Sequence, residues 1–69
     1  MIPLAGMETF KALIVEDDET FRLTLKKLLL SRFPHMEVAE AERGDEALEK
    51  ITSFSPDIVF MDIKLPGKV

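Results

Sequence analysis

The sequence predicts an α/β fold in which parallel strands alternate with helices. Continuous apolar runs occupy residues 12–15 and 58–61, and such short runs are typical of strands buried on both faces of a parallel sheet. Between these two runs lie two segments with helical periodicity, and a further strand is expected between the two helical segments. The connections are short. An order of strand, helix, strand, helix, strand indicates βαβ units with right-handed crossovers.

The first strand is expected over residues 12–15 and the first helix over residues 19–32. Apolar side chains recur in the helix at spacings i, i+4, i+7 and i+8, with basic residues between them: they are Phe21, Leu25, Leu28 and Leu29. This spacing predicts an amphipathic helix. Acidic residues at its start and basic residues toward its end suit the helix dipole, and Pro34 favours an end before that position.

The second strand is expected over residues 36–41, where apolar and acidic residues alternate imperfectly, as in a strand with one exposed edge. A second helix should begin at Gly44 and end near residues 55–56. Its inward face is expected to consist of four apolar residues, Ala47, Leu48, Ile51 and Phe54. The third strand is expected over residues 58–61.

Composition limits the kind of protein that this chain can be. Its 69 residues, 46% of them hydrophobic, suit one small globular domain. Without cysteine it has neither disulfides nor a thiolate metal site. Its apolar runs fall far short of the roughly 20 residues that cross a membrane, and a formal charge of −4 disfavours a nucleic-acid surface. We therefore expect a soluble, cytoplasmic segment that contacts neither nucleic acid nor membrane.

Acidic residues follow two of the predicted strands. Residues 16–19 are all acidic and come directly after the first strand, while Asp62 comes directly after the third. The carboxyl ends of parallel strands lie along the same edge of a sheet, so neighbouring strands would bring these carboxylates together. Converging carboxylates repel one another unless a cation lies between them, and Mg²⁺ prefers oxygen ligands. Two simpler interpretations remain: a solvated acidic loop, and an aspartate at position 62 that caps a helix or turn.

Three segments resemble the receiver domain of two-component response regulators, in the usual order and spacing. They are KALIVEDDETFR for the first strand and acidic turn, GDEALEKI for the second helix, and PDIVFMDIKLPG for the third strand and the following loop. The resemblance extends over residues 10–69, and residues 1–9 are expected to form an N-terminal leader. It implies a flavodoxin-like, doubly wound parallel sheet with the order 2-1-3 for these strands. A complete receiver also has strands four and five and helices three to five, which this chain does not include.

The resemblance also implies roles for individual residues. Asp62 matches the aspartate that accepts a phosphoryl group from a phosphohistidine, so it is the expected phosphoacceptor. Glu16 and Asp17 match the acidic pair that holds Mg²⁺ together with Asp62. Asp17 and Asp62 would be direct ligands, Glu16 would act mainly through water, and the backbone carbonyl of Lys64 matches the remaining protein ligand. Asp18 is an additional acid at a more variable position.

The implied partner is a sensor histidine kinase or a phosphotransfer protein. The implied role is that of a phosphoacceptor signalling domain, not of an enzyme acting on other substrates. In the family, a Ser or Thr and a Lys from later strands contact the phosphoryl group, and both would follow residue 69. The third strand is central in a complete receiver, so its apolar edge is expected to pair with a second copy of the chain or with further polypeptide.

Two other functions stay open. A pseudo-receiver would use the fold for dimerisation without accepting phosphate. A haloacid dehalogenase-like phosphohydrolase also uses Mg²⁺ and an aspartate after its first strand, but it needs an Asp-x-Asp spacing, and the residue two positions after Asp17 is Glu19. Turnover of a phosphate ester would indicate the hydrolase. His35, the single histidine, is expected to face solvent in a connection and not to bind a ligand.

Overall fold

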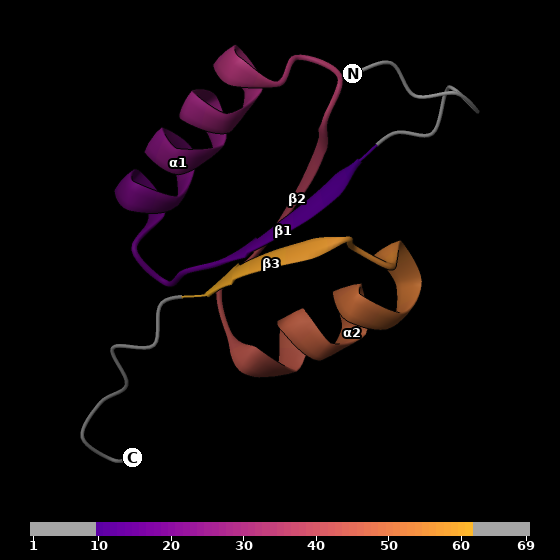
Figure 1. Ribbon diagram of the computed structural model, residues 1–69. Helices are drawn as coiled ribbons and strands as arrows, with labels where there is room; N and C mark the ends of the chain where they lie inside the picture. Colours follow the sequence, from indigo (N-terminus) through magenta and orange to yellow (C-terminus); the bar gives the residue numbers. More distant parts are fainter. Residues whose placement is uncertain (1–9, 62–69) are drawn as a thin grey trace.

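The computed structural model of the chain describes residues 10–61 (Figure 1). The elements alternate as the sequence predicts, and they are β1 (Lys11–Val15), α1 (Glu19–Arg32), β2 (Glu37–Ala41), α2 (Gly44–Phe54) and β3 (Ile58–Met61). The helices and the third strand have the expected bounds, and each of the first two strands differs by one residue at its start. Residues 1–9, the predicted leader, lie outside the described residues.

The strands form one parallel sheet in the order β2-β1-β3, with β1 in the centre. This confirms the predicted fold class, a flavodoxin-like parallel sheet with strand order 2-1-3. In the register of the sheet, Val15 of β1 lies opposite Ala41 of β2 and opposite Met61 of β3. The three strands therefore have their carboxyl ends at the same edge of the sheet.

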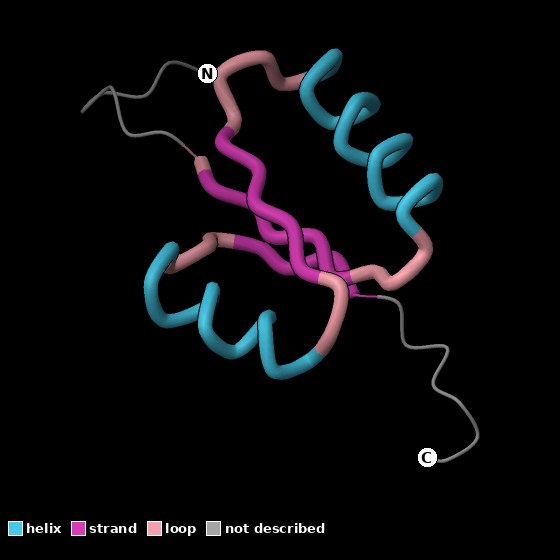
Figure 2. The backbone as a smooth tube through the Cα atoms, turned by 180° about the vertical axis from the view of Figure 1, so that it is seen from behind, coloured by secondary structure: helices cyan, strands magenta, loops and turns pink. Residues whose placement is uncertain are grey.

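The two helices cover opposite faces of the sheet, as Figure 1 shows and the reverse view in Figure 2 confirms. The first crossover, through α1, takes the chain from β1 to β2, and the second, through α2, returns it past β1 to β3. Right-handed crossovers that run in opposite directions along a sheet place their helices on opposite faces. The fold is therefore doubly wound.

The centre of the molecule is the strand β1, which is buried on both faces. The face under α2 holds an apolar cluster of buried side chains: Leu13, Val15, Ala41 and Ala47. Ala12 and Ile14 are buried as well, and they lie on the face that α1 covers because side chains alternate along a strand. This confirms the prediction of a strand buried on both faces for residues 12–15. The same prediction was wrong for residues 58–61, where Ile58, Val59 and Met61 are exposed because β3 has no neighbouring strand on its outer side within residues 10–61.

Several apolar helix residues that the periodicity predicts to face inward are exposed. Helix α2 buries Ala47, whereas Leu48 is 68% exposed and Ile51 is 42% exposed, so the prediction was wrong for these two. On α1, Phe21 and Leu28 are each 54% exposed. Within residues 10–61 each helix contacts strands only, and it therefore buries a narrower stripe than a helix that also packs against other helices.

The start of β3 is tied to the start of β1. The backbone N–H of Lys11 donates to Oδ2 of Asp57 at 2.8 Å, and the N–H of Asp57 donates to the Lys11 carbonyl at 2.7 Å. Two residues before Asp57, Ser55 ends α2 in a left-handed conformation with φ of 54°. These contacts fix where β3 begins beside β1, and so they help to set the register that places Met61 next to Val15.

Candidate functional site

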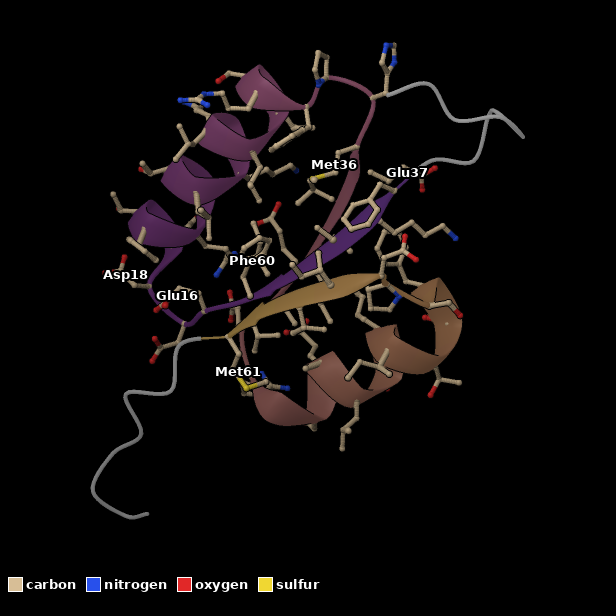
Figure 3. All side chains as sticks on the ribbon, viewed as in Figure 1. Glu16, Asp18, Met36, Glu37, Phe60 and Met61 are labelled. Carbon is tan, nitrogen blue, oxygen red and sulfur yellow. The ribbon has the colours of Figure 1, made fainter. Side chains whose placement is uncertain are left out.

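The candidate site is the edge of the sheet where β1 and β3 end side by side. Glu16 is the first residue after β1, and its backbone N–H donates to the Ala41 carbonyl at 2.9 Å, so the chain leaves β1 still joined to β2. Figure 3 shows Glu16 and Asp18 at the end of the sheet where β3 also ends. This is the edge at which open parallel sheets bind ligands, beside the point where the strand order reverses.

Glu16 is buried, with an exposed fraction of only 5%. Its Oε2 atom accepts a hydrogen bond of 3.0 Å from the backbone N–H of Asp18, so the side chain turns back onto its own loop. A buried, hydrogen-bonded carboxylate is not what a freely solvated acidic loop contains. The first residue of the acidic run therefore organises the turn.

Asp17 is exposed. Within the described part of the chain its side chain makes no hydrogen bond and no ion pair. An ionised carboxylate in this state offers both oxygens to a hard cation such as Mg²⁺. The donor chemistry of Asp17 thus fits Mg²⁺, the ion that the sequence predicts at this turn.

Asp18 begins the first helix. Its Oδ1 atom accepts from the backbone N–H of Phe21 at 3.2 Å, and its own backbone is extended, as in an N-cap residue. The first three acids that follow β1 consequently differ in their environment: Glu16 is buried in the turn, whereas Asp17 and Asp18 are exposed, and of these two Asp18 caps α1.

Asp62 and Lys64, the other predicted site residues, lie outside the described residues. Their convergence with Glu16 and Asp17 stays a prediction. Between residues 10 and 61, no group of three or more His, Cys, Asp or Glu side chains is arranged to hold a metal ion. The described residues contain two of the predicted metal ligands, Glu16 and Asp17, which are adjacent in the sequence.

Sequence reasoning missed a charged network that joins α1, β2 and the acidic turn. Arg22 is buried, with 7% of its surface exposed. Its Nε atom donates to Oε1 of Glu40 at 2.8 Å, and its Nη1 atom donates to the Glu16 carbonyl at 2.9 Å. Nζ of Lys26 donates to the other carboxylate oxygen of Glu40, Oε2, at 2.9 Å. We call Arg22, Lys26 and Glu40 the α1 charge network.

The α1 charge network has an electrostatic consequence for Glu40. Hydrogen bonds from Arg22 and then from Lys26 lower the pKa of the Glu40 carboxyl below its ordinary value of 4.5, against the opposing effect of partial burial. A signal for the network was present in the sequence, because Glu40 follows Val38 by two positions and therefore lies on the same face of the strand, the face that α1 covers. A charge on such a face indicates a buried partner.

Two further expectations can be compared with the structure. His35 is exposed in the connection between α1 and β2, as predicted. Neither helix of residues 10–61 combines the length and the apolar character that crossing a bilayer requires.

Comparison with known proteins agrees with this fold. A family model described as Response regulator receiver domain matches residues 12–69. An uncharacterized response regulatory protein of Vibrio cholerae is 42% identical over 60 residues, which are 86% of this chain and 23% of that protein. Chemotaxis protein CheY of Bacillus subtilis is 43% identical over 56 residues, which are 81% of this chain and 46% of CheY.

A third relative is named as an enzyme. A protein-glutamate methylesterase/protein-glutamine glutaminase of Carboxydothermus hydrogenoformans is 43% identical over 61 residues, which are 87% of this chain and 18% of that protein. The chain thus spans less than half the length of each of these three relatives. No solved structure gave a significant match. Because the family match extends over most of the chain, the chain belongs to the response regulator receiver domain family.

Proposed function

We propose that this receiver segment acts in a two-component phosphorelay in which Asp62 accepts a phosphoryl group. The observation that best supports the proposal is the register of the sheet, in which Val15 lies opposite Met61. Glu16 and Asp17 follow Val15 in the sequence, and Asp62 follows Met61. Carboxylates that directly follow two adjacent, parallel, equally ending strands are well placed to share one cation.

The chemistry assigns each residue one task. A carboxylate is the nucleophile that this step needs, and one oxygen of Asp62 attacks the phosphorus of a phosphohistidine. The new P–O bond forms as the P–N bond breaks, and the electron pair of that bond stays on the imidazole nitrogen. Glu16, Asp17, Asp62 and the carbonyl of Lys64 would hold Mg²⁺. When bound, Mg²⁺ neutralises charge on the phosphoryl oxygens.

The test is phosphorylation by acetyl phosphate in the presence of Mg²⁺, followed by mass spectrometry of the intact protein. The wild type should gain the mass of one phosphoryl group, and Asp62→Asn should gain none. Asp45→Asn is the matched control, because it removes an exposed carboxylate at the start of α2 and should leave the modification unchanged. Equal modification of wild type and Asp62→Asn, or no modification of either, would contradict the proposal.

The partner in this proposal is a sensor histidine kinase or a phosphotransfer protein, and the compartment is the cytoplasm. We assign residues 10–69 to the receiver segment and residues 1–9 to a leader. The haloacid dehalogenase-like alternative requires turnover of phosphate esters by the purified protein. Because Asp18 is engaged as the cap of α1 and no Asp-x-Asp spacing follows β1, we expect no such turnover.

A second candidate, self-association without phosphorylation, rests on the outer edge of β3. Within residues 10–61, β3 pairs with β1 on one side and with no strand on the other. Its side chains Ile58, Val59 and Met61 are exposed and apolar, and such an edge is a template for pairing with another chain. Light scattering should show a particle mass that rises from that of a monomer to that of a dimer as the protein concentration increases. Val59→Lys should reduce this association. A monomer mass at every concentration would exclude it.

A further inference from the structure

One hydrogen bond of Arg22 reaches the peptide group that joins Glu16 to Asp17. The Glu16 carbonyl belongs to that peptide group, and it accepts from Nη1 of Arg22 at 2.9 Å. On the preceding side, the Glu16 N–H donates to the Ala41 carbonyl at 2.9 Å. The backbone of Glu16 is thus fixed at both of its polar groups, by β2 on one side and by α1 on the other.

Arg22 is itself held in place by Glu40. The carboxylate of Glu40 accepts from Nε of Arg22 at 2.8 Å, and the two residues are 18 positions apart in the sequence. The nitrogens of a guanidinium form a rigid planar fork. Fixing Nε against Glu40 therefore also fixes the direction in which Nη1 meets the Glu16 carbonyl.

We propose that Arg22 is a positioning residue for the acidic turn, and that Glu40 orients it. By holding the carbonyl of Glu16, Arg22 sets the plane of the following peptide and hence the point from which the Asp17 carboxylate leaves the backbone. The inference rests on the proposed function in that the ion bound by this turn is Mg²⁺. Groups that orient the ligands of a metal typically contribute about tenfold to a hundredfold in metal affinity.

Lys26 provides a matched comparison. It binds the same carboxylate, through Oε2 of Glu40 at 2.9 Å, but it has no bond to the acidic turn. Both Arg22 and Lys26 are cations on α1. If the network acted only through charge or through stability, the two residues would have effects of the same kind. A positioning role requires that they differ.

The sign of the effect separates positioning from charge. Removing a cation close to the turn should strengthen the binding of another cation, because the Coulomb repulsion between them disappears. Loss of a positioning contact should weaken that binding. We therefore expect Arg22→Met to raise the Kd for Mg²⁺ by about tenfold, and Lys26→Met to leave the Kd within about twofold of the wild type or to lower it.

The experiment is a Mg²⁺ titration of wild type, Arg22→Met and Lys26→Met by calorimetry, at a temperature where circular dichroism shows each variant to be folded. In parallel, the exchange of the Glu16 and Asp18 amide protons is measured by NMR without Mg²⁺. We expect faster exchange at these two positions in Arg22→Met and unchanged exchange in Lys26→Met. If Arg22→Met does not fold, Arg22→Lys replaces it, because one ammonium cannot reproduce the fork.

The outcomes are distinct. Weaker Mg²⁺ binding and faster exchange in the Arg22 variant alone support the proposal. Unchanged or tighter binding in that variant overturns it, as does an equal loss in Lys26→Met. If the wild type binds no Mg²⁺, the proposed function fails, and the exchange data still decide on Arg22: selective acceleration supports the positioning role, and equal exchange in all variants overturns it.

Discussion

The two faces of the sheet are held to their helices in different ways. Under α2, the buried cluster is apolar, with Ala47 of the helix packed among Leu13, Val15 and Ala41 of the sheet. Lysine side chains add hydrogen bonds to backbone carbonyls there, from Lys50 to Glu40 at 2.7 Å and from Lys11 to Phe54 at 3.2 Å, but no carboxylate takes part in them. Under α1, the carboxyl end of the sheet is joined to the helix by charged groups, with Arg22 and Lys26 on one side and Glu40 on the other. The apolar face stabilises the fold, while the charged face lies against the turn that is proposed to bind Mg²⁺.

This difference implies different responses to solution conditions. Burial of apolar surface does not depend on pH, whereas an ion pair is lost when its carboxylate is protonated. The α1 charge network also contacts the backbone of Glu16, and the cluster under α2 ends at Val15, one residue earlier. We therefore expect mutations on the α2 face to change stability, and mutations on the α1 face to change both stability and the geometry of the acidic turn.

The largest effect is expected on the α2 face. Leu13 is fully buried in its apolar cluster, so Leu13→Ala should destabilise the fold by roughly 2 to 5 kcal/mol. A chain of this size buries only about 60% of its unfolded surface, and such a loss should unfold most of it. Urea unfolding followed by circular dichroism measures the effect. Leu48→Ala is the control, since Leu48 is largely exposed, and equal losses in both variants would refute the difference between the two positions.

Protonation of Glu40 should weaken the α1 face in acid. The pKa of this carboxyl is lowered in the folded state by Arg22 first and by Lys26 second. A lowered pKa means that the stabilisation is complete above the ordinary value of 4.5 and is lost as the pH falls through the folded value. Stability should therefore decline below about pH 5, and less steeply in Glu40→Gln.

The control for this pH dependence is the exposed pair of Arg43 and Asp45. The pKa of Asp45 is also lowered, mainly by its hydrogen bond from Arg43, but both side chains are largely in solvent. Exposed ion pairs contribute little to stability. Asp45→Asn should consequently leave the acid dependence of unfolding close to that of the wild type. The same acid slope in Glu40→Gln as in wild type would show that the α1 charge network does not stabilise the fold.

A smaller effect is expected at the start of α1. Asp18→Ala removes the carboxylate that accepts from the Phe21 N–H, and loss of such a cap typically costs about 1 kcal/mol. Asp18→Asn should be nearly neutral, because asparagine caps as well as aspartate does. Thermal unfolding distinguishes them. If Asn destabilised as much as Ala, the charge of Asp18 and not its role as a cap would be what matters.

The smallest effect is a gain in stability at the end of α2. Ser55 has a φ of 54°, a conformation that glycine adopts without the steric cost imposed by a Cβ atom. Ser55→Gly should raise the free energy of unfolding by roughly 0.5 kcal/mol, after the larger conformational entropy of glycine in the unfolded chain is included. Urea unfolding measures the change. A loss of stability would indicate that the Ser55 side chain contributes to the turn.

The sequence predicted the elements better than their contacts. The burial of residues 12–15 followed from one continuous apolar run, and the strand order followed from the family resemblance, since periodicity does not determine which strands are neighbours. The outward position of Leu48 was missed because periodicity identifies a wide apolar stripe, while the sheet covers only the part around Ala47. The ion pair of Arg22 with Glu40 joins residues 18 positions apart in the sequence. The sequence could show that each is a charged residue on a face expected to be buried, but not that the two form a pair.

The acidic turn is a second case in which the sequence predicted the segment but not its contacts. Composition and spacing marked residues 16–19 as one acidic run, but they could not show which member is buried, which is exposed and which caps the helix. Those differences arise from β2, which binds the Glu16 N–H, and from α1, which begins at the next residues. Tertiary contacts therefore divide the run into separate roles.

The most direct test of the central claim is paramagnetic broadening by Mn²⁺, which takes the same oxygen ligands as Mg²⁺. If Glu16, Asp17 and Asp62 share one ion, the NMR signals of Asp17 and Met61 should broaden together, and both effects should be lost in Asp62→Asn. Broadening of Asp17 without Met61, or equal broadening in Asp62→Asn, would contradict a shared site at the ends of β1 and β3.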